Sequence, residues 1–254
     1  MTFYIISVNV KNTSANQRFE TFFDAVLAII ITVLVLKLVQ PAAPTFAAVG
    51  ELGNSFLTYL TCFLILFNIW YRNHNLFQII DEISHETLVY YGLLIFALSL
   101  FPYFAIWLAF NVNSVPAQTM FGLDFLITNI IYLFSLNSIR KANPGQTLSD
   151  YKNVHTYITM IIILVGFVLT YTVFTQGIFF CCMISTIYAT TRPDKMQNEI
   201  VDSDRFEAFI DAIVAIVLTI IVLEITLANE GSWQVLFDLK LEFISYAISF
   251  SCLL

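Results

Sequence analysis

The sequence predicts an all-α integral membrane protein, built as a six-helix transmembrane repeat followed by a partial second, parallel repeat, with about eight spans. The chain of 254 residues is 59% hydrophobic and 11% charged, whereas a soluble domain averages about a quarter charged residues. Its mean hydropathy is +0.81, and several apolar stretches reach the roughly 20 residues that a helix needs to cross a bilayer. A segment near the N-terminus also recurs, in the same direction, near the C-terminus.

Continuous apolar runs favour helices over a closed β-barrel, which is the other way to span a membrane. Residues 25–36 and 156–169 are apolar almost throughout, whereas barrel strands alternate polar and apolar side chains. Proline, glycine and asparagine mark most connections, and residues 72–75 are predicted to form the loop after the second span. The predicted spans are residues 20–39, 53–71, 87–110, 117–138, 154–173, 176–190, 207–227 and 240 onward.

Basic residues predict the orientation of these spans. Nine lysines and arginines fall on the side of the membrane that holds the N-terminus, and among the loops of the opposite side only Lys240 is basic. Because basic loops tend to stay in the cytoplasm, we expect a cytoplasmic N-terminus. The nine residues are Lys11, Arg18, Arg72, Arg140, Lys141, Lys152, Arg192, Lys195 and Arg205.

An internal repeat predicts the domain organisation. An offset of 187 residues aligns residues 18–38 with 205–225, with eleven identities in 21 positions, and the same offset aligns the second span. The repeat unit is six spans long, and an even number of spans leaves both copies in the same orientation. The predicted division is a first repeat at 1–191, a cytoplasmic linker at 192–204 and the first two spans of a second repeat at 205–254.

One face of the first span carries an apolar stripe with a single hydroxyl, and the seventh span repeats it. Such a stripe suits either close helix packing or the lining of a hydrophobic gate that closes a pore by dewetting. The pattern alone favours packing. The positions are Ile29, Thr32, Val33 and Leu36 in the first copy and Ile216, Thr219, Ile220 and Leu223 in the second.

Asp24 and Asp211 lie about 140° around the helix from the stripe isoleucines, so they point away from that face. A carboxylate in a bilayer costs at least about 2.5 kcal/mol, so a polar partner is expected, and Asn73 is one candidate donor. A structural network at the cytoplasmic helix ends is preferred over a pH sensor at His74. The network is predicted to comprise Arg18, Asp24, Trp70, His74, Arg205 and Asp211.

Other polar residues and motifs narrow the function. Asp124 and Glu224 are predicted to lie near span ends, within reach of water, and to have no special role. The formal charge of −7 does not suggest a nucleic-acid partner. The sequence holds no motif of a phosphate-binding loop, a metalloprotease or a serine hydrolase, so neither an enzyme nor a cofactor is predicted.

The motif that runs from Arg18 through Phe22 to Asp24, followed by Trp70 and His74, resembles the transmembrane protein 175 family of potassium channels. In that family a serine precedes the aspartate and two histidines end the second helix. This sequence has Phe23 and Ile210 at the serine positions and asparagine where a second histidine is expected.

The resemblance implies a potassium-preferring cation leak channel in which four copies of the first helix line the pore. The resemblance favours pore lining over helix packing as the role of the apolar stripe. It implies that the constriction lies at Ile29 and Ile216. It also implies a homo-oligomer, which is a dimer if each chain has two full repeats. Alternatives are a proton-conducting or proton-coupled transporter and a non-conducting, truncated assembly partner. The favoured location is a bacterial plasma membrane, and an endosomal or lysosomal membrane is the alternative.

Overall fold

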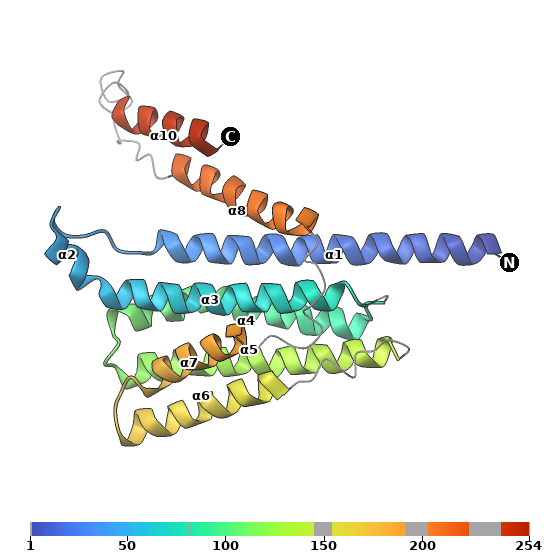
Figure 1. The fold of residues 1–254 in the computed structure, drawn as a ribbon, viewed down its shortest axis with the longest axis horizontal. Helices are drawn as coiled ribbons and strands as arrows, with labels where there is room; N and C mark the ends of the chain where they lie inside the picture. Colours follow the sequence, from blue (N-terminus) through green and yellow to red (C-terminus); the bar gives the residue numbers. More distant parts are fainter. Residues whose placement is uncertain (1, 81, 145–153, 192–202, 224–239, 254) are drawn as a thin grey trace. The chain divides into compact units, whose positions relative to one another are not determined.

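The computed structural model describes residues 2–80, 82–144, 154–191, 203–223 and 240–253, and for residues 2–15 it describes the backbone alone. The chain divides into two compact units, Met1–Val201 and Asp202–Leu254, which are described separately. Every regular element in the described ranges is a helix, as the sequence predicts (Figure 1). Unit 1 contains α1 (Thr2–Leu36), α2 (Phe46–Glu51), α3 (Gly53–Phe77), α4 (His85–Phe110), α5 (Val115–Ala142), α6 (Val154–Thr172) and α7 (Gly177–Thr191). Unit 2 contains α8 (Ser203–Leu223) and α10 (Lys240–Leu253).

Five of the described helices are long and apolar enough to cross a membrane. They correspond to the first five predicted spans, and the shorter α7 corresponds to the sixth. In unit 2, α8 and α10 begin close to the predicted starts of the last two spans. The fold class of an all-α membrane protein is thereby confirmed.

The helix boundaries correct the prediction in three places. α1 begins at Thr2, well before residue 20. α3 continues to Phe77, so the loop predicted at residues 72–75 is wrong. Asn73 and His74 are fully buried there, because tertiary neighbours accept polar side chains that the sequence alone assigns to water. The short α2 was not predicted, and its N-terminus is capped by Thr45, whose hydroxyl accepts from the Ala48 N–H at 3.3 Å.

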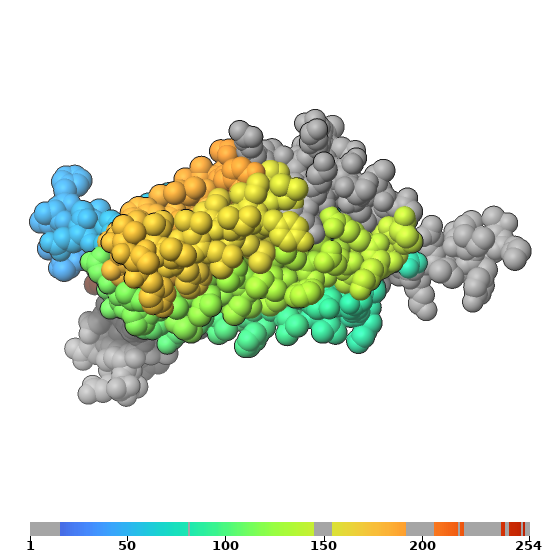
Figure 2. Space-filling model, turned by 90° about the horizontal axis from the view of Figure 1, so that it is seen from below, coloured from blue at the N-terminus to red at the C-terminus, as the bar shows by residue number. Residues whose placement is uncertain are grey.

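The long helices of unit 1 run side by side as a bundle (Figure 1). α4 packs on α5, α6 packs on α7, and α3 lies between α1 and α4. Figure 2 shows α5 and α6 covering one face of this unit, with α2 projecting at one end. α1 therefore lies at the edge of the bundle, with one face packed against α3 and α4.

The side chains of α6 are arranged as expected for a helix in lipid. Four of its five buried positions are threonine or glycine, and most of its outward positions are aliphatic. Lipid tails satisfy aliphatic side chains, so the hydroxyls and glycine turn inward to the neighbouring helices. The buried residues are Thr156, Thr159, Ile163, Gly166 and Thr170, and the exposed ones include Ile161, Leu164, Val165 and Val168.

The start of α7 lies inside the bundle, where its free N–H groups need partners. Thr170 of α6 accepts from the Ile178 N–H at 2.9 Å, and Gln118 of α5 accepts from the Phe179 N–H at 3.0 Å. Gln118 is itself fully buried. Side chains from two neighbouring helices thus cap α7 and fix the α6–α7 hairpin against α5.

Candidate functional site

One face of α1 is left uncovered by unit 1. Phe22, Ile29 and Leu36 are 56%, 47% and 38% exposed, and Ala25 and Val33 between them are half-buried. These five residues follow a spacing of three and four, so they form one continuous helix face, which we term the α1 stripe. The opposite face is packed from Phe23 to Leu34 and contains Phe23, Leu27, Ala28, Ile31 and Leu34.

The structure separates Thr32 from the other three predicted lining positions of α1. Ile29, Val33 and Leu36 belong to the α1 stripe, whereas Thr32 is only 2% exposed. Its hydroxyl donates to the Ile29 carbonyl at 2.8 Å. Thr32 lies about 60° around the helix from Ile29, and the bundle covers that edge of the stripe.

The equivalent positions of α8 share this local geometry. Thr219 donates to the Ile216 carbonyl at 2.8 Å, which matches the bond in α1. Ile216 and Ile220 are half-buried, and the side chain of Leu223 lies outside the described residues. Within α1 and α8, a threonine hydroxyl therefore bonds to the carbonyl of the isoleucine three residues earlier.

Phe23 occupies the place of the expected serine and changes the chemistry of the motif. It is fully buried and meets Phe77 and Tyr91 edge-on, with ring centroids 6.4 and 5.4 Å away. Phe19, one turn earlier, meets the same two rings at 5.9 and 5.3 Å. Edge-to-face pairs of this kind add about 0.5–1.5 kcal/mol each beyond burial, so an aromatic cluster ties α1 to α3 and α4.

The motif residues of α3 are buried beside this cluster. Trp70 and His74 stack with ring centroids 5.2 Å apart, and the His74 Nε2 lies 3.1 Å from the Gln78 amide nitrogen. Asn73 accepts from the Tyr91 hydroxyl at 2.6 Å and donates to the Ile69 carbonyl at 2.7 Å. The structure thus directs the Asn73 side chain to α4 and to its own helix.

The motif aspartates, Asp24 and Asp211, differ in burial between the two repeats. Asp24 is buried, and its neighbour Phe23 touches Phe77, so Asp24 lies level with the last turns of α3. Arg18 and Asp211 are exposed, and the side chain of Arg205 lies outside the described residues. A motif network that includes Trp70 and His74 stays a prediction.

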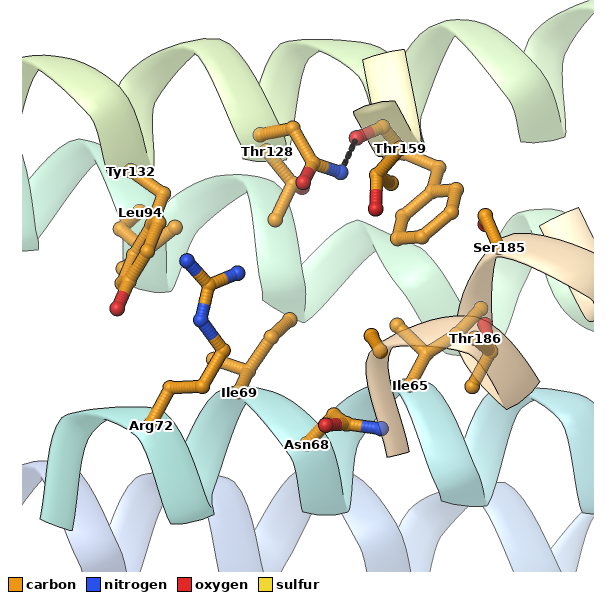
Figure 3. A pocket seen from close by; sticks show the side chains of 13 residues that line it. Ile65, Asn68, Ile69, Arg72, Leu94, Thr128, Tyr132, Thr159, Ser185 and Thr186 are labelled. Carbon is orange, nitrogen blue, oxygen red and sulfur yellow. Dashed lines mark hydrogen bonds between the residues drawn. The ribbon is translucent and has the colours of Figure 1, made fainter. Parts of the chain in front are cut away.

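A cavity of about 40 Å³ lies behind α1, between α3 and α5–α7 (Figure 3). Arg72 enters it from α3, lies 4.4 Å from the centroid of the Tyr132 ring and donates to the Thr156 hydroxyl at 2.6 Å. At another edge, Asn68 donates to the Thr190 hydroxyl at 2.6 Å. Arg72 therefore lies in α3 and not in the predicted loop, and this cavity was not predicted, although the hydroxyls along α6 are a usable signal for it.

The burial of Asp124 contradicts the prediction that it lies near a span end. It is 5% exposed and lies well inside α5, so the expectation that water reaches it at a span end is wrong. The physical reason is that α5 is longer than the predicted span at both ends and is covered by its neighbours. Glu224, to which the same expectation applied, lies outside the described residues.

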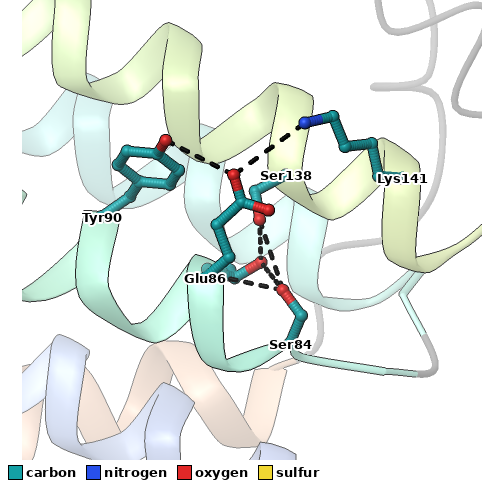
Figure 4. A network of polar contacts seen from close by, with 6 residues as sticks. Ser84, Glu86, Tyr90, Ser138 and Lys141 are labelled. Atoms are coloured by element: carbon teal, nitrogen blue, oxygen red, sulfur yellow. Dashed lines mark hydrogen bonds and ion pairs between the residues drawn. The ribbon is translucent and has the colours of Figure 1, made fainter.

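A polar clamp joins the start of α4 to the end of α5 (Figure 4). Ser84 caps α4 by accepting from the Thr87 N–H at 3.1 Å, and the Thr87 and Ser138 hydroxyls lie 2.9 Å apart. The Lys141–Glu86 ion pair nearby is 3.9 Å long and exposed, so it contributes at most about 1 kcal/mol. The buried hydroxyls rather than the ion pair set how these helix ends meet.

Asn143 completes the clamp, and its removal is expected to weaken the fold. Its side chain accepts from the Glu82 N–H at 3.0 Å and donates to the Glu82 carbonyl at 2.9 Å. Asn143→Ala leaves both backbone groups without these partners, so we expect a loss of about 1–3 kcal/mol in unfolding free energy. Thermal unfolding of the detergent-purified protein measures this, with Asn137→Ala, an exposed asparagine of α5, as the control. Equal melting temperatures for the two variants would contradict the role of Asn143.

Comparisons with known proteins find sequence similarity to potassium channels. Residues 18–102 and 205–254, more than half of the chain, match the family described as endosomal/lysosomal potassium channel TMEM175. A potassium channel from Chryseobacterium sp. is 29% identical over 153 residues, which cover 59% of this chain and 79% of that protein. A potassium channel from Chamaesiphon minutus is 31% identical over 102 residues, which cover 38% of this chain and 50% of that protein.

A solved structure has the same fold. The crystal structure of a lysosomal potassium-selective channel TMEM175 homolog from Chamaesiphon minutus superposes with a TM-score of 0.63 at 23% identity. The match covers 70% of this chain and 98% of that chain.

Proposed function

Because the chain belongs to the TMEM175 family of potassium channels, we propose that it conducts potassium ions through a pore lined by α1 and its repeat, α8. The family is a channel family and not a class of enzyme. The chain is an integral membrane protein, with five described helices able to span a bilayer. The two potassium channels named above come from bacteria, and this supports a bacterial plasma membrane as the location.

The α1 stripe is the observation that carries this proposal. It is the face of α1 that unit 1 leaves uncovered, and its sequence recurs in α8 at a constant offset of 187 residues. Repetition of one helix face within a chain suits a ring of equivalent helices around a common axis. The other helices of unit 1 then act as the scaffold that holds α1 against this axis.

In this proposal a hydrophobic constriction at Ile29 and Ile216 gates the pore and limits conduction when it is dry. Aliphatic side chains that meet on the axis expel water, and ions do not pass a dry constriction. Val33 and Leu36 continue the lining one and two turns further along the α1 stripe. Because the constriction in this proposal is made of side chains, and the sequence contains no T-V-G-Y-G filter to replace the hydration shell, selectivity for potassium over sodium is modest.

Assembly follows from the number of lining helices. A closed ring of four needs four copies of the stripe, and one chain brings two copies, at α1 and α8. We propose a homo-oligomer, with a dimer as the state in which each chain contributes both repeats. The division into a first repeat at 1–191, a linker at 192–204 and a second repeat from 205 belongs to this proposal, as does the cytoplasmic N-terminus.

Ion flux through liposomes tests the function. Purified protein reconstituted into vesicles is expected to pass potassium several times faster than sodium, without saturation, because ions cross an open constriction rather than occupy a carrier site. A fluorescent potential-sensitive dye measures both fluxes under opposite gradients. Absence of flux from correctly assembled protein, or saturable uptake without single-channel currents, would overturn the channel in favour of an assembly partner or a carrier.

A further inference from the structure

The cavity between α3 and α5–α7 has an unusual polar wall. Besides apolar side chains, one arginine and two asparagines, it is lined by five hydroxyl-bearing residues, which are Thr128, Tyr132, Thr159, Ser185 and Thr186 (Figure 3). These hydroxyls come from α5, α6 and α7, three helices that are adjacent in the bundle. No role in the pore proposed above requires them, because the cavity lies on the packed side of α1.

The buried hydroxyl of Thr128 lacks a hydrogen-bond partner among the described residues, which points to a bound ligand. Thr128 is 2% exposed. A buried hydroxyl left unsatisfied destabilises the fold, so native structures supply a protein group or an ordered water. Ser185 and Thr186 both donate to the Cys182 carbonyl at 2.8 Å, which leaves their oxygen atoms as acceptors at the cavity wall.

The size and chemistry of the cavity select water as the ligand. One buried water needs about 10–15 Å³ of such space and two to four polar partners, so a cavity of about 40 Å³ holds about three. A purely apolar ligand would leave Thr128 unsatisfied. A metal cation is disfavoured by the Arg72 guanidinium at the wall. Water can both accept from Thr128 and donate to Ser185 or Thr186.

Asp124 lies one helical turn before Thr128 on the same face of α5. Its Oδ2 atom is buried and has no hydrogen-bond partner in the described residues. Its titratable neighbour on α3 is Cys62, a fully buried thiol within electrostatic range, and Arg72 stands at the far wall of the cavity. Asp124 is not itself among the residues that line the cavity. Cβ atoms one turn apart on a helix are about 5–6 Å from each other, a gap that one further hydrogen bond from a water at Thr128 can bridge.

We propose that this cavity holds a cluster of about three waters that satisfies Thr128 and exchanges protons with Asp124. In each exchange the O–H bond of the protonated carboxyl breaks, the adjacent water accepts the proton, and the carboxylate keeps the electron pair. The proton then passes along the cluster to bulk water at the edge where Asn68 meets the exposed Thr190. Unit 1 thereby contains a proton-exchange site that is separate from the α1 stripe.

Infrared difference spectroscopy of the full chain in lipid tests the proposal, with D₂O as the probe. Wild-type protein is expected to show a carboxylic acid C=O band that Asp124→Asn removes and that shifts on transfer to D₂O. Thr128→Val should slow this shift about tenfold, because the nearest water loses its hydrogen-bond donor, whereas Thr128→Ser keeps the hydroxyl and the fast exchange. Equal exchange rates in Thr128→Val and Thr128→Ser would overturn the proposal, and so would the absence of the band from wild type.

A high-resolution structure gives an independent outcome that does not depend on how Asp124→Asn folds. Density for a water within hydrogen-bond distance of the Thr128 hydroxyl, lost in Thr128→Val, is the expected result. A dry cavity in the wild-type protein would overturn the proposal. Potassium flux distinguishes a failure of the proposed pore from a failure of the proton-exchange site, because Thr128→Val is expected to leave the potassium flux unchanged.

Discussion

Ile29→Asn is expected to raise potassium flux by about tenfold or more, which corresponds to lowering the barrier at the constriction by at least about 1.4 kcal/mol. Ile29 is 47% exposed at the middle of the α1 stripe, so a polar amide there fits without repacking unit 1. The amide binds water, and water at the constriction removes the dewetting barrier that excludes ions. The measurement is the initial rate of potassium efflux from vesicles containing equal amounts of protein.

Ile161→Asn is the matched control for this change. Ile161 is an exposed isoleucine of α6, which faces away from the packed bundle and is not on α1. Its replacement introduces the same amide into the same bilayer, so it reports any general leak that a polar side chain causes. Equal flux in the two variants, or no rise in Ile29→Asn, would contradict the gate. Ile216→Asn should act in the same direction, because the repeat places it at the equivalent position.

Gly166→Ala is expected to destabilise the α6–α7 hairpin by about 1–3 kcal/mol, the usual penalty for overpacking. A methyl group at Gly166 would lie 2.8 Å from the Cys181 Cβ and 3.1 Å from the Ile178 Cα. Both atoms are held by α7 itself, so neither side chain can rotate to make room. Small residues at such contacts are what allow membrane helices to approach closely.

Gly92→Ala in α4 is the control for Gly166→Ala. A methyl group there meets no atom within 4 Å, so the substitution is expected to be neutral or slightly stabilising. The midpoint of thermal unfolding, followed by size-exclusion chromatography of the heated protein, compares the two variants. Similar midpoints would show that α7 shifts at little cost and that the close contact is not what holds the hairpin.

The motif residues show how far sequence reasoning reaches within one site. The spacing from Arg18 to Asp24 and its repeat at residue 205 identified the family without any structure. The same reasoning proposed Trp70, Asn73 and His74 as partners of Asp24, and the structure instead pairs Asn73 with Tyr91 of α4. Periodicity assigns a residue to a helix face, but it does not state which helix that face meets.

The sequence by itself determined the fold class, the positions of the spans and the repetition of the first helix. Each of these depends on hydrophobic run length or on identity along the chain, which a bilayer converts directly into helices. Only the tertiary structure decided that Thr32 leaves the α1 stripe, that Arg72 enters the bundle and that Asp124 is buried. Those outcomes depend on which neighbours cover each side of a helix, and in a membrane both lipid and a neighbouring helix accept the same apolar side chain.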